Sequence, residues 1–329
     1  MVLAASDELR HPHDDGFNWR ESLYFNFADA GNGLGGWLYL WLVPNKPLKS
    51  GMLVSLYHGR HEQRNVNDIA MKSPGHLHRP DPDRWVYCYK RDFEPLLSAN
   101  FDAVELGGLR LQRTRPLESY HIEFADDAGT RLELEGEFVM PPYDYADGEF
   151  STPWWVAANR YHRTWKVRGD LLLAGQRYRI DTTGDTDHSW GTRDMETFST
   201  HTFKMWSLQT PDARKSISVI EQGKGCYLGF VNIDGDIRSV RHIEQSARYS
   251  KSGVQAAIDM KVRDTADRVV HARMDEMFSF IGHGEPAGLW GFEGVGRYDV
   301  EGWGPCTGVA SYFWPPTVAP DRLNETGPL

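Results

Sequence analysis

Alternation between apolar and polar residues is the clearest pattern along this chain. In residues 119–124, the side chains of Tyr120, Ile122 and Phe124 fall on one face of an extended segment, and the polar residues between them fall on the other. Residues 131–135 alternate in the same way. This period is typical of antiparallel strands with one wet face. Since no window of helical length shows a sustained 3.6-residue apolar period, the pattern predicts an all-β protein.

Short β-prone runs continue through both halves of the chain, separated by turns rich in Gly, Pro and Asn. Between residues 140 and 156, the clusters Pro141–Gly148 and Pro153–Trp155 interrupt them. We interpret this stretch as a linker, which predicts two β-domains over residues 1–150 and 151–329. Many regularly spaced strands are typical of sandwiches or barrels, and aromatic inward faces favour barrels around ligand cavities.

Composition narrows the classes of partner. The 329 residues suffice to bury a sizeable core without disulfides or metals. Aromatic residues make up 12% of the chain, including 12 Trp, which suits both strands and apolar ligand cavities. The net charge of −10 and the lack of any Lys/Arg run argue against binding to nucleic acid or to an anionic membrane surface. The expected partner is a hydrophobic small molecule.

The cysteines and the N-terminal residues indicate a compartment. Cys88, Cys226 and Cys306 lie far apart without a C-x-x-C pair, so we expect buried thiols in a reducing compartment. Residues 1–16 are polar, so we expect an arm or a lead-in loop there and expect no signal peptide. No apolar run reaches about 18 residues, the length a membrane-spanning helix needs. We expect a cytoplasmic protein, and the sequence is compatible with a homodimer while leaving the oligomeric state open.

The stretch Asp185–Asp194 contains the densest chemistry, with three carboxylates, an imidazole, an indole and a guanidinium within ten residues. Strand-like runs lie on both sides of it, so it enters or leaves a sheet. If it is extended, alternation places His188 and Trp190 on one face and Asp185 and Asp187 on the other. We expect the first pair to face a pocket.

The run Asp187–Gly191, preceded by Gly184 and followed by Arg193-Asp194, resembles the signature of a tandem-lipocalin family. This family includes carotenoid 1,2-hydratase (hydroxyneurosporene synthase), kievitone hydratase and the fungal decalin-forming Diels–Alderases. Residues 17–25 and 159–163 also resemble this group. The resemblance implies two lipocalin-like (calycin) antiparallel β-barrels in tandem, with a pocket for a hydrophobic small molecule. Its members differ in chemistry, so the fold alone does not decide function.

In the hydratases of this family, a histidine and a tryptophan of the motif are implicated, together with a tyrosine and an aspartate further along. His188 and Trp190 match the first two. The following run, residues 201–206, contains no Tyr-x-Asp. The sequence therefore departs from the carotenoid-hydratase pattern at this point.

Hydration of an isolated alkene requires an acid that protonates carbon, a π-face that stabilises the carbocation and a group that positions water. Trp190 could supply the face, because a cation over an indole gains roughly 0.5–2 kcal/mol, and His188 could orient water or shuttle the proton. A carboxylic acid in an apolar cavity has a raised pKa. Asp194 is the first candidate for this acid and Asp185 the second.

Structural roles compete with these functional ones. His188 could bond a backbone carbonyl, Trp190 could fill core, and Asp187 could pair with Arg193 across the domain junction. Arg193 is then either that partner or a clamp for a substrate carboxylate. The other candidates for substrate binding are Tyr161, Trp155 and Trp206. The two tryptophans also suit ordinary core packing.

A metal site is the next alternative. His58-x-x-His61-Glu62 and His76-x-His78 offer ligands, but their spacing fixes no third ligand, and we predict no metal. No nucleophile elbow, phosphate-binding loop or H-E-x-x-H helix is present in the sequence, and no nucleotide or flavin is implied.

These observations predict a cofactor-independent lyase or isomerase, meaning a hydratase, dehydratase or cyclase. It would act by acid/base catalysis in a barrel pocket, at or near the domain junction, on an alkene of a hydrophobic terpenoid, polyketide or aromatic secondary metabolite. The second hypothesis is a non-catalytic carrier of a hydrophobic metabolite. A buried acid in the pocket favours catalysis, whereas a lining of only apolar groups and backbone favours carriage.

Overall fold

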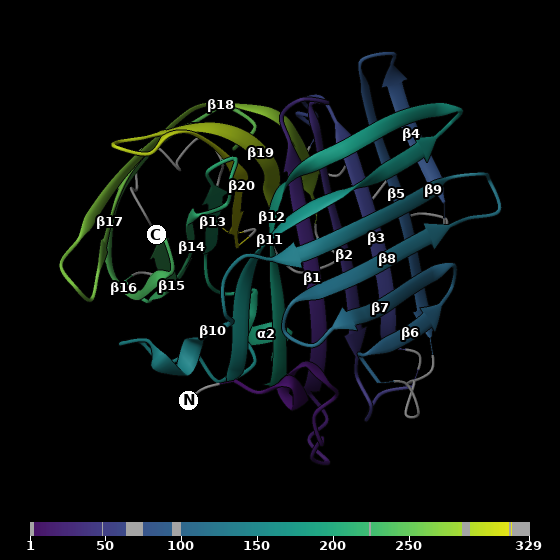
Figure 1. The fold of residues 1–329 in the computed structure, drawn as a ribbon, viewed down its shortest axis with the longest axis horizontal. Coiled ribbons are helices and arrows are strands. Elements are labelled where there is room, and N and C mark those ends of the chain that lie inside the picture. Colours follow the sequence, from purple (N-terminus) through teal and green to yellow (C-terminus); the bar gives the residue numbers. More distant parts are fainter. Residues whose placement is uncertain are drawn as a thin grey trace.

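The computed structural model describes residues 3–47, 49–63, 75–93, 100–223, 225–284, 290–315 and 317. Nearly all regular structure in these ranges is antiparallel β-strand, arranged as a twelve-stranded sheet beside a closed barrel (Figure 1). The helical elements within the described ranges are η1 (Ala5–Glu8), η2 (Tyr145–Asp147) and α2 (Met195–Phe198). No helix in this part of the chain is long and apolar enough to cross a membrane.

The twelve-stranded sheet runs in the order β4-β5-β3-β2-β1-β12-β11-β9-β8-β7-β6, and β10 pairs with β11 beside this path. Its strands are β1 (Trp19–Asp29), β2 (Leu34–Leu42), β3 (Ser50–His58), β4 (His76–Asp81), β5 (Arg84–Phe93), β6 (Ala103–Leu106), β7 (Leu109–Arg115), β8 (Ser119–Ala125), β9 (Arg131–Phe138), β10 (Tyr143–Asp144), β11 (Asn159–Leu173) and β12 (Gln176–Thr192). The sheet curls over, so that β7–β9 cross in front of β1–β3 (Figure 1).

The core of this sheet forms between its two curled halves. Phe25 and Phe27 on β1 belong to the same buried cluster as Ile122 and Phe124 on β8 and Trp165 on β11. The alternation seen in residues 119–124 is the reason, because it turns every second side chain toward the inside of the curl.

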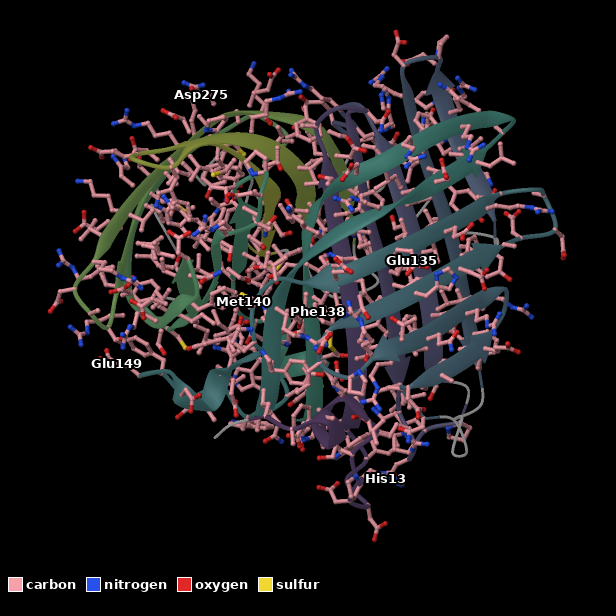
Figure 2. The ribbon with its side chains drawn as sticks, in the orientation of Figure 1. His13, Glu135, Phe138, Met140, Glu149 and Asp275 are labelled. Carbon is pink, nitrogen blue, oxygen red and sulfur yellow. The ribbon has the colours of Figure 1, made fainter. Side chains whose placement is uncertain are left out.

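The closed barrel is formed by strands β13 to β20, between residues 203 and 314. Its strands, in barrel order, are β13 (Phe203–Gln209), β14 (Lys215–Gln222), β15 (Tyr227–Ile233), β16 (Asp236–Tyr249), β17 (Gln255–Asp264), β18 (Val269–His283), β19 (Trp290–Val300) and β20 (Gly304–Trp314). Side chains such as Trp206, Met260 and Trp314 fill its interior. Charged side chains such as Glu149 and Asp275 project from the outer surface of the molecule (Figure 2).

A third buried cluster joins the two units. It combines Trp37 and Tyr57 from the outer face of the first sheet with Met205, Ile281 and Val309 from the outer face of the barrel. The space between sheet and barrel is therefore a packed interface, and it is where the site described below lies.

The predicted fold class, an all-β tandem of lipocalin-like units, is confirmed. The first unit, however, is an open curled sheet whose path ends at β4 and β6. The three cysteines are free thiols, and Cys226 is the one that is not buried.

The change from sheet to barrel falls between β12 and β13, after the linker predicted at residues 140–156. Both β11 and β12 are hydrogen-bonded within the first sheet, to β9 and β1 respectively. The proline-containing stretch is instead an excursion that contacts the barrel, where the Tyr143 hydroxyl donates to Ser239 Oγ at 2.9 Å. The break in strand pattern therefore marks a detour of the chain and not the end of the first sheet.

The N-terminal lead-in packs against the first sheet. Glu8 is fully buried, with Oε1 2.6 Å from Arg163 Nη1 and Oε2 3.2 Å from Arg113 Nη1. The Leu117 amide also donates to Glu8 Oε2, at 2.6 Å. A polar segment thus becomes structural because its carboxylate completes buried ion pairs.

Candidate functional site between the sheet and the barrel

A cavity of about 720 Å³ lies between the first sheet and the outer face of the barrel, outside the barrel lumen. Its apolar and aromatic lining comprises Tyr24, Trp37, Tyr39, Trp41, Leu53, Met195, Phe198, Phe203, Met205 and Phe313. Its main polar lining groups are Arg20, Arg160, His162, Asp185, Asp187, Arg193, His283, Glu293 and Ser311. Cavities of this size take small organic ligands.

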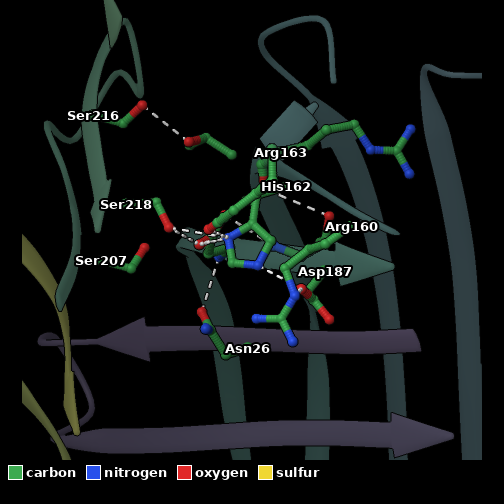
Figure 3. Close-up of polar contacts among 12 residues, drawn as sticks. Asn26, Arg160, His162, Arg163, Asp187, Ser207, Ser216 and Ser218 are labelled. Atoms are coloured by element: carbon green, nitrogen blue, oxygen red, sulfur yellow. Dashed lines mark hydrogen bonds and ion pairs between the residues drawn. The ribbon is translucent and has the colours of Figure 1, made fainter. Parts of the chain in front are cut away.

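The hairpin β11–β12 supplies one polar wall of this cavity. His162 lies opposite Asp187 in the register of the two strands, and His162 Nε2 is 2.5 Å from Asp187 Oδ2 (Figure 3). On the other side of the imidazole ring, Nδ1 lies 3.4 Å from Asp185 Oδ2 and 3.1 Å from Ser218 Oγ. The ring thus lies between two carboxylates.

This arrangement fixes charges on the hairpin wall. Burial alone would lower the pKa of His162, but Asp187 and Asp185 outweigh it and raise that pKa to about 9. Burial opposes ionisation of Asp187 as well, yet Arg160 and His162 hold its pKa well below the usual range. At neutral pH the wall therefore carries an imidazolium and a carboxylate in contact.

Two guanidinium groups meet at one phenol beside this wall. Arg20 Nη2 donates to the Tyr39 hydroxyl at 2.9 Å, and Arg193 Nη1 donates to the same oxygen at 3.2 Å. Burial would raise the pKa of Tyr39, but the two guanidiniums outweigh it and lower the pKa below its ordinary value. Burial, with Arg20 and Arg160 nearby, lowers the pKa of Arg193 to about 10. This end of the cavity is strongly electropositive.

The barrel supplies an acid on the facing wall. Glu293 on β19 is buried and accepts one hydrogen bond, from Ser311 Oγ at 3.4 Å. Burial raises its pKa to about 7. Its Oε1 has no hydrogen-bond partner among the described residues. On the neighbouring strand, burial lowers the pKa of His283 to about 4, which keeps that imidazole neutral.

The motif residues divide into two faces as alternation predicts, but the cavity lies on the face of Asp185 and Asp187. His188 lies on the opposite face, fully buried, with Nε2 2.9 Å from Glu21 Oε1 and Nδ1 3.1 Å from the Tyr161 hydroxyl. Trp190 lies on that face too. Because both faces of β12 are buried, the apolar pattern does not distinguish the face that meets the cavity.

His11, from the N-terminal lead-in, completes the cluster on this second face. Its ring stacks on Trp190 with centroids 3.6 Å apart, and its Nδ1 is 2.8 Å from Glu21 Oε1. Burial opposes ionisation of Glu21, but hydrogen bonds from His11 and His188 outweigh it and lower its pKa. The cluster is a connected hydrogen-bond chain in which a buried carboxylate is satisfied from two sides.

The remaining predicted site residues have different surroundings. Asp194 is the N-cap of α2, accepting from the amides of Glu196 and Thr197, and its hydrogen bonds with Thr197 lower its pKa. Trp206 is part of the barrel interior. Trp155 stacks on His201 with centroids 4.6 Å apart. Of the predicted catalytic and substrate-binding residues, Asp185 and Arg193 line the cavity.

Two groups of side chains in the described part of the chain could hold a metal ion. One is His11, Glu21 and His188, whose ligand atoms lie within 4.8 Å of one another, and the other is a partly exposed cluster around His121. In the first group the distances of 2.8 and 2.9 Å to Glu21 are those of hydrogen bonds. The metal alternative considered from the sequence, around His58 and His76, does not form such a group.

His162 and Glu293 were not among the residues predicted from the sequence, although both have a recognisable sequence signal. Glu293 is the carboxylate on the strand face that it shares with Gly291 and Val295, in an otherwise apolar run. His162 belongs to a polar alternation, from residue 160 to residue 164, that is buried throughout. Buried polar groups on regular strands are candidates for function because their burial is costly unless they are partnered.

Comparison with known proteins assigns a family. Residues 4–284 match a domain family described as "Domain of unknown function (DUF7064)". The chain belongs to this family. No curated protein is significantly similar to it in sequence.

Solved structures share the fold of this DUF7064 protein. A protein assigned as AttH from Nitrosomonas europaea matches with a TM-score of 0.57 at 12% identity, over 92% of this chain and 93% of that one. Kievitone hydratase from Nectria haematococca gives 0.52 at 10% identity, over 89% and 87%. CghA gives 0.53 at 11% identity, over 90% and 87%. The predicted resemblance to tandem-lipocalin proteins is confirmed at the level of the fold.

Proposed function

We propose that this protein is a lyase or isomerase, a hydratase, dehydratase or cyclase, that acts on an alkene of a hydrophobic small molecule in the cavity between sheet and barrel. The observation that carries the proposal is Glu293. It is a buried carboxylic acid with a pKa near neutrality, on the wall of an aromatic-lined cavity. Such a group can donate a proton at neutral pH and take it back, which is what an acid/base catalyst must do.

The cycle starts with Glu293 protonated. Its proton moves to one alkene carbon, the π electrons form the new C–H bond, and the other carbon becomes a cation. The faces of Trp37 and Phe313 line the same cavity and can stabilise that cation. In a hydratase, water adds to the cation and returns a proton to the Glu293 carboxylate; in an isomerase or cyclase, a proton leaves carbon for the same carboxylate. Each complete cycle returns Glu293 to its protonated form without a cofactor.

In this proposal, the buried cluster around His188 positions the strands that carry the cavity residues. The chain from Tyr161 through His188 to Glu21 and His11 fixes β11, β12 and β1 relative to one another. These strands carry the His162–Asp187 pair and the arginines of the cavity. Trp190 packs on this chain through His11. The similarity in fold to a hydratase supports the proposed reaction class.

Solvent deuterium tests the proposal. Native mass spectrometry identifies a small molecule that co-purifies with the protein, and that molecule is then incubated with the protein in D2O. Proton transfer from Glu293 to carbon places deuterium on the product skeleton, so the mass rises in a carbon-bound position. Glu293→Gln should still bind the molecule and lose this incorporation.

The alternative is a carrier of a hydrophobic metabolite, favoured by the largely aromatic and apolar lining. A bound molecule that is recovered unchanged and unlabelled after prolonged incubation in D2O would support the carrier and contradict the proton-transfer role of Glu293.

A further inference from the structure

We infer that the cavity selects an amphipathic carboxylic acid, whose carboxylate is held by Arg20 and Arg193 beside Tyr39 while its apolar body extends toward Glu293. This inference rests on the proposed function, since it names the class of substrate that would occupy the same cavity. Both guanidiniums line the cavity and converge on the Tyr39 oxygen. Pairs of guanidiniums are well suited to planar anions.

Around this end of the cavity, positively charged side chains outnumber negatively charged ones. Arg20, Arg160, Arg193 and the imidazolium of His162 face the carboxylates of Asp185 and Asp187. Four cations therefore meet two anions in a largely buried place. Uncompensated buried charge of this kind is costly for a folded protein, and an anionic ligand removes the excess.

Of these four cations, Arg20 and Arg193 are the two that do not pair with Asp185 or Asp187. Arg160 Nε lies 3.2 Å from Asp187 Oδ2, and His162 contacts the same carboxylate. By contrast, the recorded partners of Arg193 are the Tyr39 and Ser189 hydroxyls and the Val156 carbonyl. Among the described residues, neither Arg20 nor Arg193 forms an ion pair with a carboxylate, and the Nε–H of each lacks an acceptor. Each of these two guanidiniums therefore has an N–H donor that is available to a ligand.

Aromatic rings hold Arg20 in place for this task. Its guanidinium carbon lies 5.2 Å from the ring centroid of Tyr39 and 5.4 Å from that of Trp41. Stacking of this kind restricts the guanidinium plane without using its hydrogen-bond donors. A carboxylate can therefore bind to a positioned group, with less ordering cost than a mobile surface arginine would impose.

The walls also define the rest of the ligand. Besides the arginines, the lining comprises apolar side chains such as Trp37, Leu53, Met205 and Phe313, together with Glu293. Arg20 lies on β1 of the sheet and Arg193 follows β12, whereas Glu293 lies on β19 of the barrel. A ligand whose carboxylate binds on the sheet side would therefore present its apolar body to the acid on the barrel side. The selected class is thus an apolar carboxylic acid whose reacting alkene is separated from its carboxylate.

Three matched probes test this inference: geranic acid, its primary amide, and geranyl phosphate, each titrated by isothermal calorimetry. The acid should bind roughly tenfold to a hundredfold more tightly than the amide, the range expected for hydrogen bonds to a charged group. Arg20→Gln and Arg193→Gln should each remove most of this advantage and leave the affinity for the amide unchanged. Arg193→Lys should recover part of it. Arg168→Gln, which changes an exposed guanidinium on β11 outside the lining of this cavity, is the matched control and should leave both affinities within about threefold.

The outcomes separate this inference from the proposed function. Equal binding of acid and amide would overturn the carboxylate site while leaving the cavity as the place of an apolar ligand. Tighter binding of the phosphate than of the acid would overturn the carboxylate in favour of a phosphate monoester. If none of the three probes binds, both the carboxylate site and the use of this cavity are contradicted. Since Arg193 also bonds backbone, a poorly folded Arg193→Gln would leave the decision to Arg20→Gln, whose recorded hydrogen bond is to a side chain.

Discussion

Replacing Glu293 by glutamine should make the protein more stable at alkaline pH and inactive at every pH. Glutamine has nearly the same shape and can still accept the hydrogen bond from Ser311 Oγ. It cannot ionise, so it removes the cost of a carboxylate in the cavity wall together with the proton that the proposed reaction needs. Stability and turnover should therefore change in opposite directions.

The magnitude follows from the raised pKa. The pKa of Glu293 moves from the ordinary value of 4.5 to about 7 in the folded protein, which corresponds to about 3 kcal/mol of unfolding free energy. Below pH 4.5 the carboxyl is protonated in both states and contributes no difference. Between pH 4.5 and about 7 the unfolded chain is ionised while the folded one keeps its proton, so the wild-type protein loses stability as pH rises. Above about 7 the whole cost is present.

Chemical denaturation at pH 4.5 and at about pH 8 measures this cost. Glu293→Gln should come within about 0.5 kcal/mol of the wild type at the lower pH, where the unfolded carboxyl is half ionised, and exceed it by about 3 kcal/mol at the higher. Glu301→Gln is the control, because that side chain is 81% exposed and should show no such pH-dependent gain. An equal difference between Glu293→Gln and wild type at both pH values would contradict the raised pKa, since Glu293 would then not keep its proton in the folded protein.

Three further predictions address His188, Asp194 and His162. His188→Ala should lower the unfolding free energy at neutral pH by about 3 kcal/mol or more, because it leaves the buried carboxylate of Glu21 with one partner fewer; equal denaturation midpoints would contradict the buried pair. Asp194→Ala should slightly lower the thermal midpoint, since it removes an N-cap, and should leave turnover unchanged; lost turnover with an intact fold would return Asp194 to the list of acids. The pKa of His162, raised from 6.5 to about 9, gives stability that is complete below pH 6.5 and lost as pH rises through about 9. His162→Gln should flatten the denaturation profile over that window, and an unchanged slope there would contradict the pairing.

The alternation of residues 185–194 correctly predicts which of them share a face of β12. Local sequence does not predict which face meets the cavity. His188 and Asp187 do lie on opposite sides of β12. Which side meets a cavity depends on what packs against each, and here one side meets the curl of its own sheet while the other meets the barrel. Since both are buried, side-chain type alone does not decide between them.

The role of Glu293 as the cavity acid could not be predicted from the sequence for a related reason. Glu293 lies about a hundred residues after the motif in the chain, and it reaches the cavity only because the barrel closes and its outer face packs on the first sheet. The composition break at residues 140–156, which predicted a linker, also depends on distant contacts. Its prolines mark a detour that contacts the barrel, after which the chain returns to pair with β9. Both features depend on contacts distant in sequence, which a period of two residues does not encode.

The position of the cavity has a consequence for how this fold can change its chemistry. Side chains such as Leu53, Phe203 and Phe313 line the cavity from the outer faces of two separately packed units. Substitutions there can alter the shape and polarity of the binding space without touching the interior of either unit, where changes of volume are costly. In this architecture, ligand preference can therefore change without loss of folding stability. New specificities can arise through single substitutions on either wall of the cavity.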